Sequence, residues 1–276
     1  MASVKLPDGT EVAALGQGTW HMGEKPGQRQ AEIAALRLGI ELGLTLIDTA
    51  EMYGEGGAEE VVGDAIDGRR DEVFLVSKVY PHNASRRGLP QACERSLKRM
   101  RVETIDLYLL HWRGSVPLDE TVEAMERMQA AGKIRHWGVS NFDVGDLEEL
   151  GQALENCATD QVLLNLQHRG PQFDLLPFCE GRGMPVMAYS PVGQGGALLR
   201  DRALGQVAKA HGVTAAQIAV AWTLSFPGVI SIPKATQPDH VRANAAAAEI
   251  VLTEEDHAAL DAAFPPPKKK RSLAML

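Results

Sequence analysis

The sequence is short of the features that mark secreted, metal-binding and membrane proteins. Its three cysteines are far apart and form no Cys-x-x-Cys pair, which argues against a disulfide framework or a zinc site and suits a reducing compartment. No apolar run approaches the roughly 20 residues that span a bilayer. Residues 1–10 contain no apolar core of a secretory signal. We therefore expect a soluble, cytoplasmic protein that does not associate with a membrane.

Basic charge is also scarce. The 28 lysines and arginines are outnumbered by 36 aspartates and glutamates, which gives a net charge of −8. Because a nucleic acid partner requires a basic surface, this balance argues against one, and it weakly disfavours an anionic membrane surface as well. A small anionic ligand held in a local basic pocket remains compatible with the composition.

What the sequence does contain is a repeated alternation of short apolar runs and longer segments with helical spacing. The runs are expected to be strands and lie at 13–20, 44–47, 73–76, 105–110, 134–139, 162–166, 186–188 and 229–232. Between them, apolar residues recur three or four positions apart, most clearly at 33–44, 89–97, 122–128 and 218–224, as in helices with one buried stripe. About eight strand–helix units in 276 residues predict an α/β fold, the (β/α)8 or TIM barrel.

Three further features define the expected architecture. A hairpin is predicted at residues 4–12, where Asp8-Gly9 can supply the positive φ angles of a type I′ turn. No linker interrupts the chain, so residues 1–276 are interpreted as a single domain with extra helices near its C-terminus. An open doubly wound sheet is the alternative, disfavoured because no Gly-x-Gly-x-x-Gly motif follows the first strand. The Pro/Lys-rich segment 264–271 is interpreted as a solvated tail or a loop across the barrel mouth.

Ionisable residues stand where the expected strands end. Asp48, Lys78 and His111 each follow an apolar run, and Tyr53 comes five residues after Asp48. In a parallel barrel these strand ends share one face, where active sites are found. Each residue alone could be a turn former, a solvated group or a packing residue. Together they predict a site in which Asp48 pairs with Lys78, because burying either charge unpaired is costly.

The expected chemistry is proton donation. Tyrosine has a pKa of ~10, and the ammonium of Lys78 nearby should lower the pKa of Tyr53. His111 would hydrogen-bond the carbonyl oxygen of a substrate. A positioned acid contributes about 10²–10⁴ in rate and suits protonation of a developing alkoxide. Such a site supplies no redox equivalent of its own.

Several motifs resemble those of the aldo-keto reductase family. Leu46-Ile47-Asp48-Thr49-Ala50-Glu51-Met52-Tyr53-Gly54, Ser77-Lys78 and Leu109-Leu110-His111-Trp112 are similar to its signatures, and the resemblance covers nearly the whole chain. It implies hydride transfer from NADPH to a small carbonyl compound, with Tyr53 as general acid. The implied catalytic tetrad is Asp48, Tyr53, Lys78 and His111.

The same resemblance implies a cofactor site. Ser140 and Asn141 would hold the nicotinamide carboxamide together with Gln161, and Tyr189 would stack under the ring or, as a plainer alternative, fill the barrel mouth. Asp160 stands where most members of the family have asparagine. The implied contacts are Gly18, Thr19, Trp20, Asp48, Ser140, Asn141, Gln161, Tyr189, Ser190, Pro191, Val192, Gly193, Gln194, Ile232, Lys234, Ala235, Thr236, His240 and Asn244.

The phosphate end of that site departs from the family pattern. The glycines of 193–196 would lie near the pyrophosphate. Lys234 would meet the 2′-phosphate, with His240 and Arg242 as helpers, but His240 replaces a common arginine and loses its bidentate geometry. Ala235 likewise replaces a common serine. NADPH is the implied cofactor, and NADH use remains an alternative.

Within the family, the chain resembles bacterial reductases of the methylglyoxal reductase and 2,5-diketogluconate reductase type. Residues 16–24 and 76–81 and the Pro/Lys-rich C-terminus carry this likeness to the methylglyoxal reductases in particular. It implies a small aldehyde or ketoaldehyde as substrate. The implied substrate contacts are Trp20, Met52, Tyr80, His111 and Trp112.

Two other classes of function stay open on the sequence. One is a cofactor-binding, redox-sensing regulatory subunit with little turnover, although no partner-binding insertion is visible. The other is a sugar-phosphate isomerase or a metal-dependent hydrolase, because a barrel alone does not determine function. The eight histidines form no His-x-His or His-Glu-x-x-His pattern, so we expect no metal. We also expect a monomer.

Overall fold

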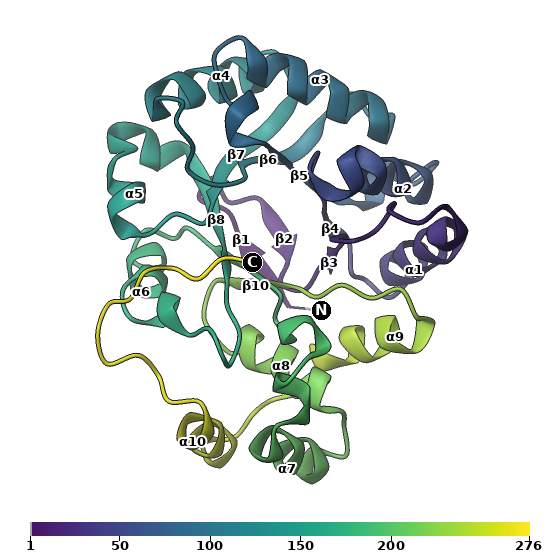
Figure 1. The fold of residues 1–276 in the computed structure, drawn as a ribbon, viewed down its shortest axis with the longest axis vertical. Coiled ribbons are helices and arrows are strands. Elements are labelled where there is room, and N and C mark those ends of the chain that lie inside the picture. The colour runs from purple at the N-terminus through teal and green to yellow at the C-terminus, as the bar shows by residue number, and fades with distance from the viewer. Residues whose placement is uncertain (1) are drawn as a thin grey trace.

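The predicted barrel is present in the computed structural model, which describes residues 2–276. Within those residues, eight parallel strands are hydrogen-bonded in chain order (Figure 1). The barrel closes where Leu15 pairs in parallel with Ser231, whose N–H donates to the carbonyl oxygen of Ala14 at 2.8 Å. The strands are β3 (Gln17–Gly18), β4 (Leu46–Asp48), β5 (Phe74–Val79), β6 (Ile105–Leu110), β7 (Ile134–Ser140), β8 (Cys157–Leu163), β9 (Val186–Tyr189) and β10 (Val229–Ile232). The (β/α)8 fold is thereby confirmed.

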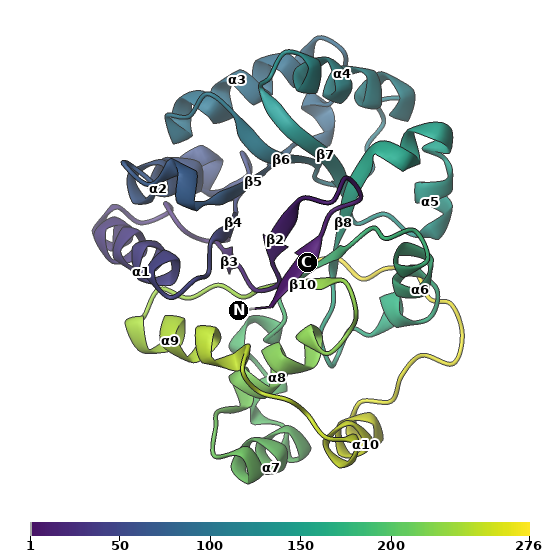
Figure 2. The ribbon, with the colours of Figure 1, turned by 180° about the vertical axis from the view of Figure 1, so that it is seen from behind.

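Helices surround the barrel, and α7 and α10 are additional to the one-helix-per-strand pattern near the C-terminus, as expected (Figures 1 and 2). The α-helices of the described residues are α1 (Arg29–Glu41), α2 (Gly57–Ala65), α3 (Gly88–Met100), α4 (Leu118–Ala130), α5 (Val144–Glu148), α6 (Leu175–Glu180), α7 (Arg202–His211), α8 (Ala215–Leu224), α9 (Pro238–Ala247) and α10 (Glu254–Ala263). The short 3-10 helices are η1 (Pro26–Gln28), η2 (Tyr53–Gly56), η3 (Arg70–Glu72), η4 (Pro81–Asn83), η5 (Gly151–Asn156), η6 (Gly170–Gln172), η7 (Gly193–Gly195) and η8 (Leu198–Arg200). No helix within residues 2–276 is long and apolar enough to cross a membrane.

The predicted hairpin is formed by β1 (Ser3–Lys5) and β2 (Glu11–Ala13), which pair antiparallel and lie on the near side of the barrel in Figure 2 (dark purple). Its turn is longer than the expected type I′ turn. Gly9 alone has positive φ there, at 89°, and the Leu6 N–H donates to the carbonyl oxygen of Thr10. Leu6 and Val12 pack with strand residues of the barrel interior such as Leu46. The hairpin therefore belongs to the core that supports the barrel.

Strand β8 begins earlier than the apolar pattern predicted. It spans Cys157–Leu163, and the expected strand over 162–166 overlaps only its end. Thr159, Asp160 and Gln161 are buried inside it, so a search for apolar runs passes over this strand. Their burial places polar groups next to the carboxyl end of β7.

Candidate active site

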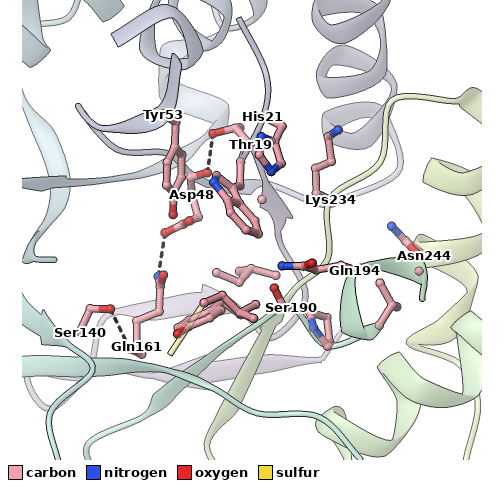
Figure 3. Close-up of a pocket in the computed structure, with 18 of the residues that line it drawn as sticks. Thr19, His21, Asp48, Tyr53, Ser140, Gln161, Ser190, Gln194, Lys234 and Asn244 are labelled. Carbon is pink, nitrogen blue, oxygen red and sulfur yellow. Dashed lines mark hydrogen bonds between the residues drawn. The ribbon is translucent and has the colours of Figure 1, made fainter. Parts of the chain in front are cut away.

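A cavity of about 820 Å³ opens at the carboxyl ends of the barrel strands (Figure 3). Residues at the ends of β3, β4, β6, β7, β8, β9 and β10 line it, together with α9 and the last residues of the chain. Its size falls in the range of small-molecule and cofactor sites. The predicted meeting of strand ends on one face is therefore observed.

Lys78 is the centre of the polar cluster. Its side chain is fully buried, and Nζ donates to Asp48 Oδ2 at 2.7 Å, to the Thr49 carbonyl oxygen at 2.9 Å and to Tyr53 Oη at 3.1 Å. An ammonium has three N–H groups, and each has an acceptor here. Because Tyr53 receives a hydrogen bond from Lys78, its own O–H is left to donate into the cavity. The expected Asp48–Lys78 pair is present.

Asp48 is held from three sides. Besides the contact with Lys78, its Oδ1 accepts a hydrogen bond from Gln161 Nε2 at 2.7 Å. The main-chain oxygen of Asp48 accepts one from Thr19 Oγ1 at 2.9 Å, and both contacts are drawn in Figure 3. The Asp48 residue is 2% exposed, so these partners replace the water that its carboxylate would otherwise bind. Gln161 thus orients Asp48, a role that the sequence did not suggest.

The pKa of Tyr53 corrects one expectation. Burial raises the pKa above its ordinary value, and the opposing charge of Lys78 does not outweigh this effect. The expected net fall ignored the loss of solvation, which penalises a buried phenolate. Burial by itself lowers the pKa of Lys78, but the charge of Asp48 raises it above its usual value. The pair is therefore a protonated tyrosine beside an ammonium, as a proton donor requires.

His111 contributes a neutral imidazole. Its ring lies 5.7 Å from that of Tyr53, between centroids, in an edge-on arrangement. Burial, aided by the charge of Lys78, lowers the pKa of His111 to about 2. Nδ1 is buried and has no hydrogen-bond partner among residues 2–276. Since an unpaired buried lone pair costs less than an unpaired N–H, we place the proton on Nε2.

This depressed pKa predicts how stability depends on pH. An unfolded histidine binds a proton near pH ~6.5, whereas folded His111 does not until about pH 2, so its contribution to stability is lost as the pH falls below ~6.5. Between pH 6.5 and 5 the loss is about 2 kcal/mol, at ~1.4 kcal/mol per pH unit. In His111→Gln, the free energy of unfolding in urea should fall less over this interval. Parallel curves for the two proteins would contradict the assignment.

The residues predicted to hold the nicotinamide are hydrogen-bonded to one another and to their neighbours. Ser140 Oγ donates to the carbonyl oxygen of Gln161 at 2.8 Å. Asn141 Nδ2 donates to the main-chain oxygen of His111 at 3.1 Å, and its Oδ1 accepts from Tyr189 Oη at 2.9 Å. Asn141 also has φ of 62°, in the left-handed region that asparagine adopts more readily than most non-glycine residues. These contacts preorganise the turn after β7.

The structure brings most of the predicted site residues together. The cavity is lined by Gly18, Thr19, Trp20, Asp48, Met52, Tyr53, His111, Trp112, Ser140, Asn141, Gln161, Tyr189, Ser190, Pro191, Val192, Gln194, Ile232, Lys234, His240 and Asn244. At Gly18, a Cβ atom would meet the carbonyl oxygen of Ile232 at 2.8 Å, so this position needs glycine for the close strand approach. The cavity therefore runs from the tetrad to the expected phosphate end.

Other predicted residues lie off the cavity. Gly193, Ala235 and Thr236 are not among its lining residues, and neither is Arg242. Tyr80 packs edge-on against Trp112, with 5.9 Å between ring centroids, and does not reach the cavity surface. The expected substrate contact by Tyr80 is thus replaced by a packing role behind Trp112.

Sequence reasoning missed several lining residues. They are His21, Leu199, Thr214, Ala216, Ala243, Met275 and Leu276, whereas Gly195, one of the glycines expected near the pyrophosphate, does line the cavity. Thr214 had a detectable signal, since it and Gln217 form a capping box at the start of α8. Met275 and Leu276 had none, because their position depends on the path of the whole C-terminal segment. No cluster of three or more potential metal ligands occurs within residues 2–276.

Comparison with known proteins establishes the family. The model of the aldo/keto reductase family matches residues 14–264, and the chain belongs to this family, a family of oxidoreductases. This confirms the resemblance read from the motifs. The chain is 52% identical to methylglyoxal reductase YeaE of Escherichia coli, over 99% of this chain and 98% of that protein. It is 35% identical to glyoxal reductase of Bacillus subtilis, over 94% and 92% of the two chains.

Solved structures agree with the sequence comparison. The structure of an aldo/keto reductase from Klebsiella pneumoniae in complex with NADP and acetate is 52% identical in sequence, with a TM-score of 0.97 over 99% of both chains. A second structure of an aldo-keto reductase from the same organism, in complex with NADPH, matches with the same identity and TM-score over 100% of both chains. Because the whole chains agree so closely, the site at the carboxyl ends of the barrel strands is a sound basis for proposing a function.

Proposed function

We propose that this protein reduces small aldehydes or ketoaldehydes resembling methylglyoxal to alcohols by hydride transfer from NADPH, with Tyr53 as general acid. The single observation that carries the proposal is the buried Lys78 ammonium, which hydrogen-bonds both Asp48 and Tyr53 at the cavity. The similarity to methylglyoxal and glyoxal reductases favours a small dicarbonyl substrate. We further propose that the chain acts as a monomer.

The chemistry of the cavity suits a dinucleotide. Ser140, Asn141 and Gln161 offer amide and hydroxyl groups at one end, where a carboxamide would be held. At the other end Lys234 is exposed, lines the cavity and forms no ion pair with any residue in 2–276, so its charge is available to a phosphate. When bound, NADPH supplies the hydride that no side chain of the site can supply.

The residues of the tetrad provide the proton. The Tyr53 hydroxyl donates to the substrate carbonyl oxygen and transfers its proton as negative charge develops there. The resulting phenolate is stabilised by the Lys78 ammonium, which already lies 3.1 Å from the hydroxyl oxygen. His111, neutral, donates a second hydrogen bond to the same oxygen. The carbonyl thus gains a hydride at carbon and a proton at oxygen, which yields the alcohol.

A panel of small aldehydes, ketoaldehydes and keto sugars, assayed with NADPH and with NADH, tests the proposal. We expect consumption of NADPH with methylglyoxal and formation of the corresponding alcohol in equal amounts. Tight binding of NADPH with negligible turnover of every carbonyl compound would instead support a role as a redox-sensing regulatory subunit.

Cofactor preference should respond to His240. This residue is exposed at the start of α9 and lines the cavity with Lys234 and Asn244. His240→Arg adds a permanent charge able to bind phosphate in bidentate fashion, so the ratio of kcat/KM for NADPH over NADH should rise about tenfold. Ala246→Arg places the same charge on an exposed, non-lining position of α9 and is the matched control. An equal ratio in both variants would mean that His240 lies away from the 2′-phosphate.

A further inference from the structure

The last residues of the chain cross the carboxyl face of the barrel. We define the C-terminal strap as residues 265–276, which carry no helix or strand and run from α10 past α6 toward the barrel centre (yellow in Figure 1). At its end, Met275 and Leu276 line the same cavity as Tyr53 and Trp112. The strap therefore forms part of the wall around the proposed substrate position.

Several contacts hold the strap in place. Immediately before the strap, Arg169 Nη1 donates to the carbonyl oxygen of Phe264 and pairs with Asp261 at 2.7 Å. In its middle, Leu273 packs against the main hydrophobic cluster. At its end, Leu276 lies in the cavity wall together with Tyr189. The strap therefore spans different parts of the barrel rim.

Lys270 connects the middle of the strap to the segments just before α5 and α6. Lys270 Nζ lies 3.2 Å from Asp174 Oδ2, just before α6, and 3.6 Å from Asp143 Oδ2, just before α5. Asp143 comes two residues after Asn141, whose side chain accepts a hydrogen bond from Tyr189. Lys270 therefore connects the strap to the turn after β7, whose Asn141 is in turn held by Tyr189.

These ion pairs are weak enough to be released. The side chains are 47% exposed for Lys270, 38% for Asp143 and 32% for Asp174. Pairs in such positions contribute little each and are screened by salt. Of the contacts that hold the strap, this bridge is therefore the one that moderate ionic strength or a single substitution can undo, while the buried Lys78–Asp48 pair is unaffected.

We propose that Lys270 is a specificity-determining residue: by bridging Asp143 and Asp174 it holds the C-terminal strap across the cavity, so that Met275 and Leu276 close the site around small carbonyl compounds and exclude bulkier ones. This inference rests on the proposed function. Lys270 touches neither substrate nor tetrad and acts by positioning the strap.

The test compares Lys270→Gln with the wild type, using methylglyoxal and para-nitrobenzaldehyde as small and bulky substrates. We expect KM for methylglyoxal to rise about three- to fivefold in low salt with kcat unchanged, and selectivity to shift toward the aromatic aldehyde. Added NaCl should raise the wild-type KM toward that of the variant and leave the variant unaffected. Asp174→Asn should behave similarly, since the Asp174 side chain makes no cap hydrogen bond in α6.

Two controls distinguish loss of the ion pairs of Lys270 from loss of a positive charge elsewhere on the strap. Lys270→Arg should restore wild-type KM. Lys269→Gln removes a neighbouring exposed charge that forms no ion pair within residues 2–276 and should change nothing. If Lys270→Gln matches Lys269→Gln in both substrates, the proposal is overturned while wild-type turnover still supports the proposed function.

A second readout does not depend on turnover. Trp20 and Trp112 line the cavity, whereas Trp137 and Trp222 are almost fully buried. Release of the strap in Lys270→Gln should increase quenching of tryptophan fluorescence by acrylamide at low salt, and salt should produce the same increase in the wild type. Identical quenching in Lys270→Gln, Lys269→Gln and the wild type would overturn the proposal even if no substrate were turned over.

Discussion

Tyr53→Phe is expected to lower kcat for methylglyoxal reduction by about 10²–10⁴ while the Kd for NADPH stays nearly constant. The variant removes only the hydroxyl that receives the Lys78 hydrogen bond and faces the cavity. The phenyl ring still packs beside His111, so the cavity should keep its shape. Steady-state kinetics and quenching of protein fluorescence by NADPH measure the two effects separately.

The matched control for this result is Tyr80→Phe. Tyr80 packs against Trp112 outside the cavity, and loss of its hydroxyl removes no group from the proposed reaction. Its kcat should remain within a small factor of the wild type. Full turnover by Tyr53→Phe would remove Tyr53 as the proton donor.

Lys78→Met should have the largest effect on stability. It leaves the Asp48 carboxylate buried without its cation, and breaking a buried ion pair in this way costs about 3–5 kcal/mol. Activity should be lost as well, because the phenolate of Tyr53 loses its stabilising charge. The free energy of unfolding from urea titration measures the first effect, and NADPH consumption measures the second.

A double variant tests the cause of that loss. Asp48→Asn combined with Lys78→Met removes both charges, so the unpaired buried carboxylate disappears and much of the stability should return. Activity should not return, because the ammonium is still missing. If Lys78→Met were as stable as the wild type, Asp48 and Lys78 would not form the ion pair described above.

Much of the fold was predictable because periodicity and strand ends are local properties of the sequence. Asp48, Lys78 and His111 each follow an apolar run, and a parallel barrel brings such positions to one face. Strand β8 was misplaced because Asp160 and its polar neighbours are buried within it. Their burial depends on partners far away in the sequence, such as the contact between Gln161 and Asp48.

The site was predictable in its composition but less so in its electrostatics. The sequence placed Lys78 beside Tyr53, and from this the pKa of Tyr53 was expected to fall. Its rise depends on how completely the hydroxyl is removed from water, which only the packed structure reveals. The C-terminal strap was left as either a solvated tail or a loop across the barrel mouth. The contacts of Lys270 with Asp143 and Asp174 favour the loop.

The proposed reaction couples hydride transfer from NADPH to protonation by Tyr53 at one site. It is tested most directly by mixing the preformed complex of enzyme and NADPH with excess methylglyoxal and following the nicotinamide absorbance through a single turnover. We predict that the absorbance falls rapidly in the wild type and stays nearly constant in Tyr53→Phe, with NADPH bound in both. Bound NADPH that remains unoxidised in the wild type with every carbonyl compound offered would contradict the proposed reaction.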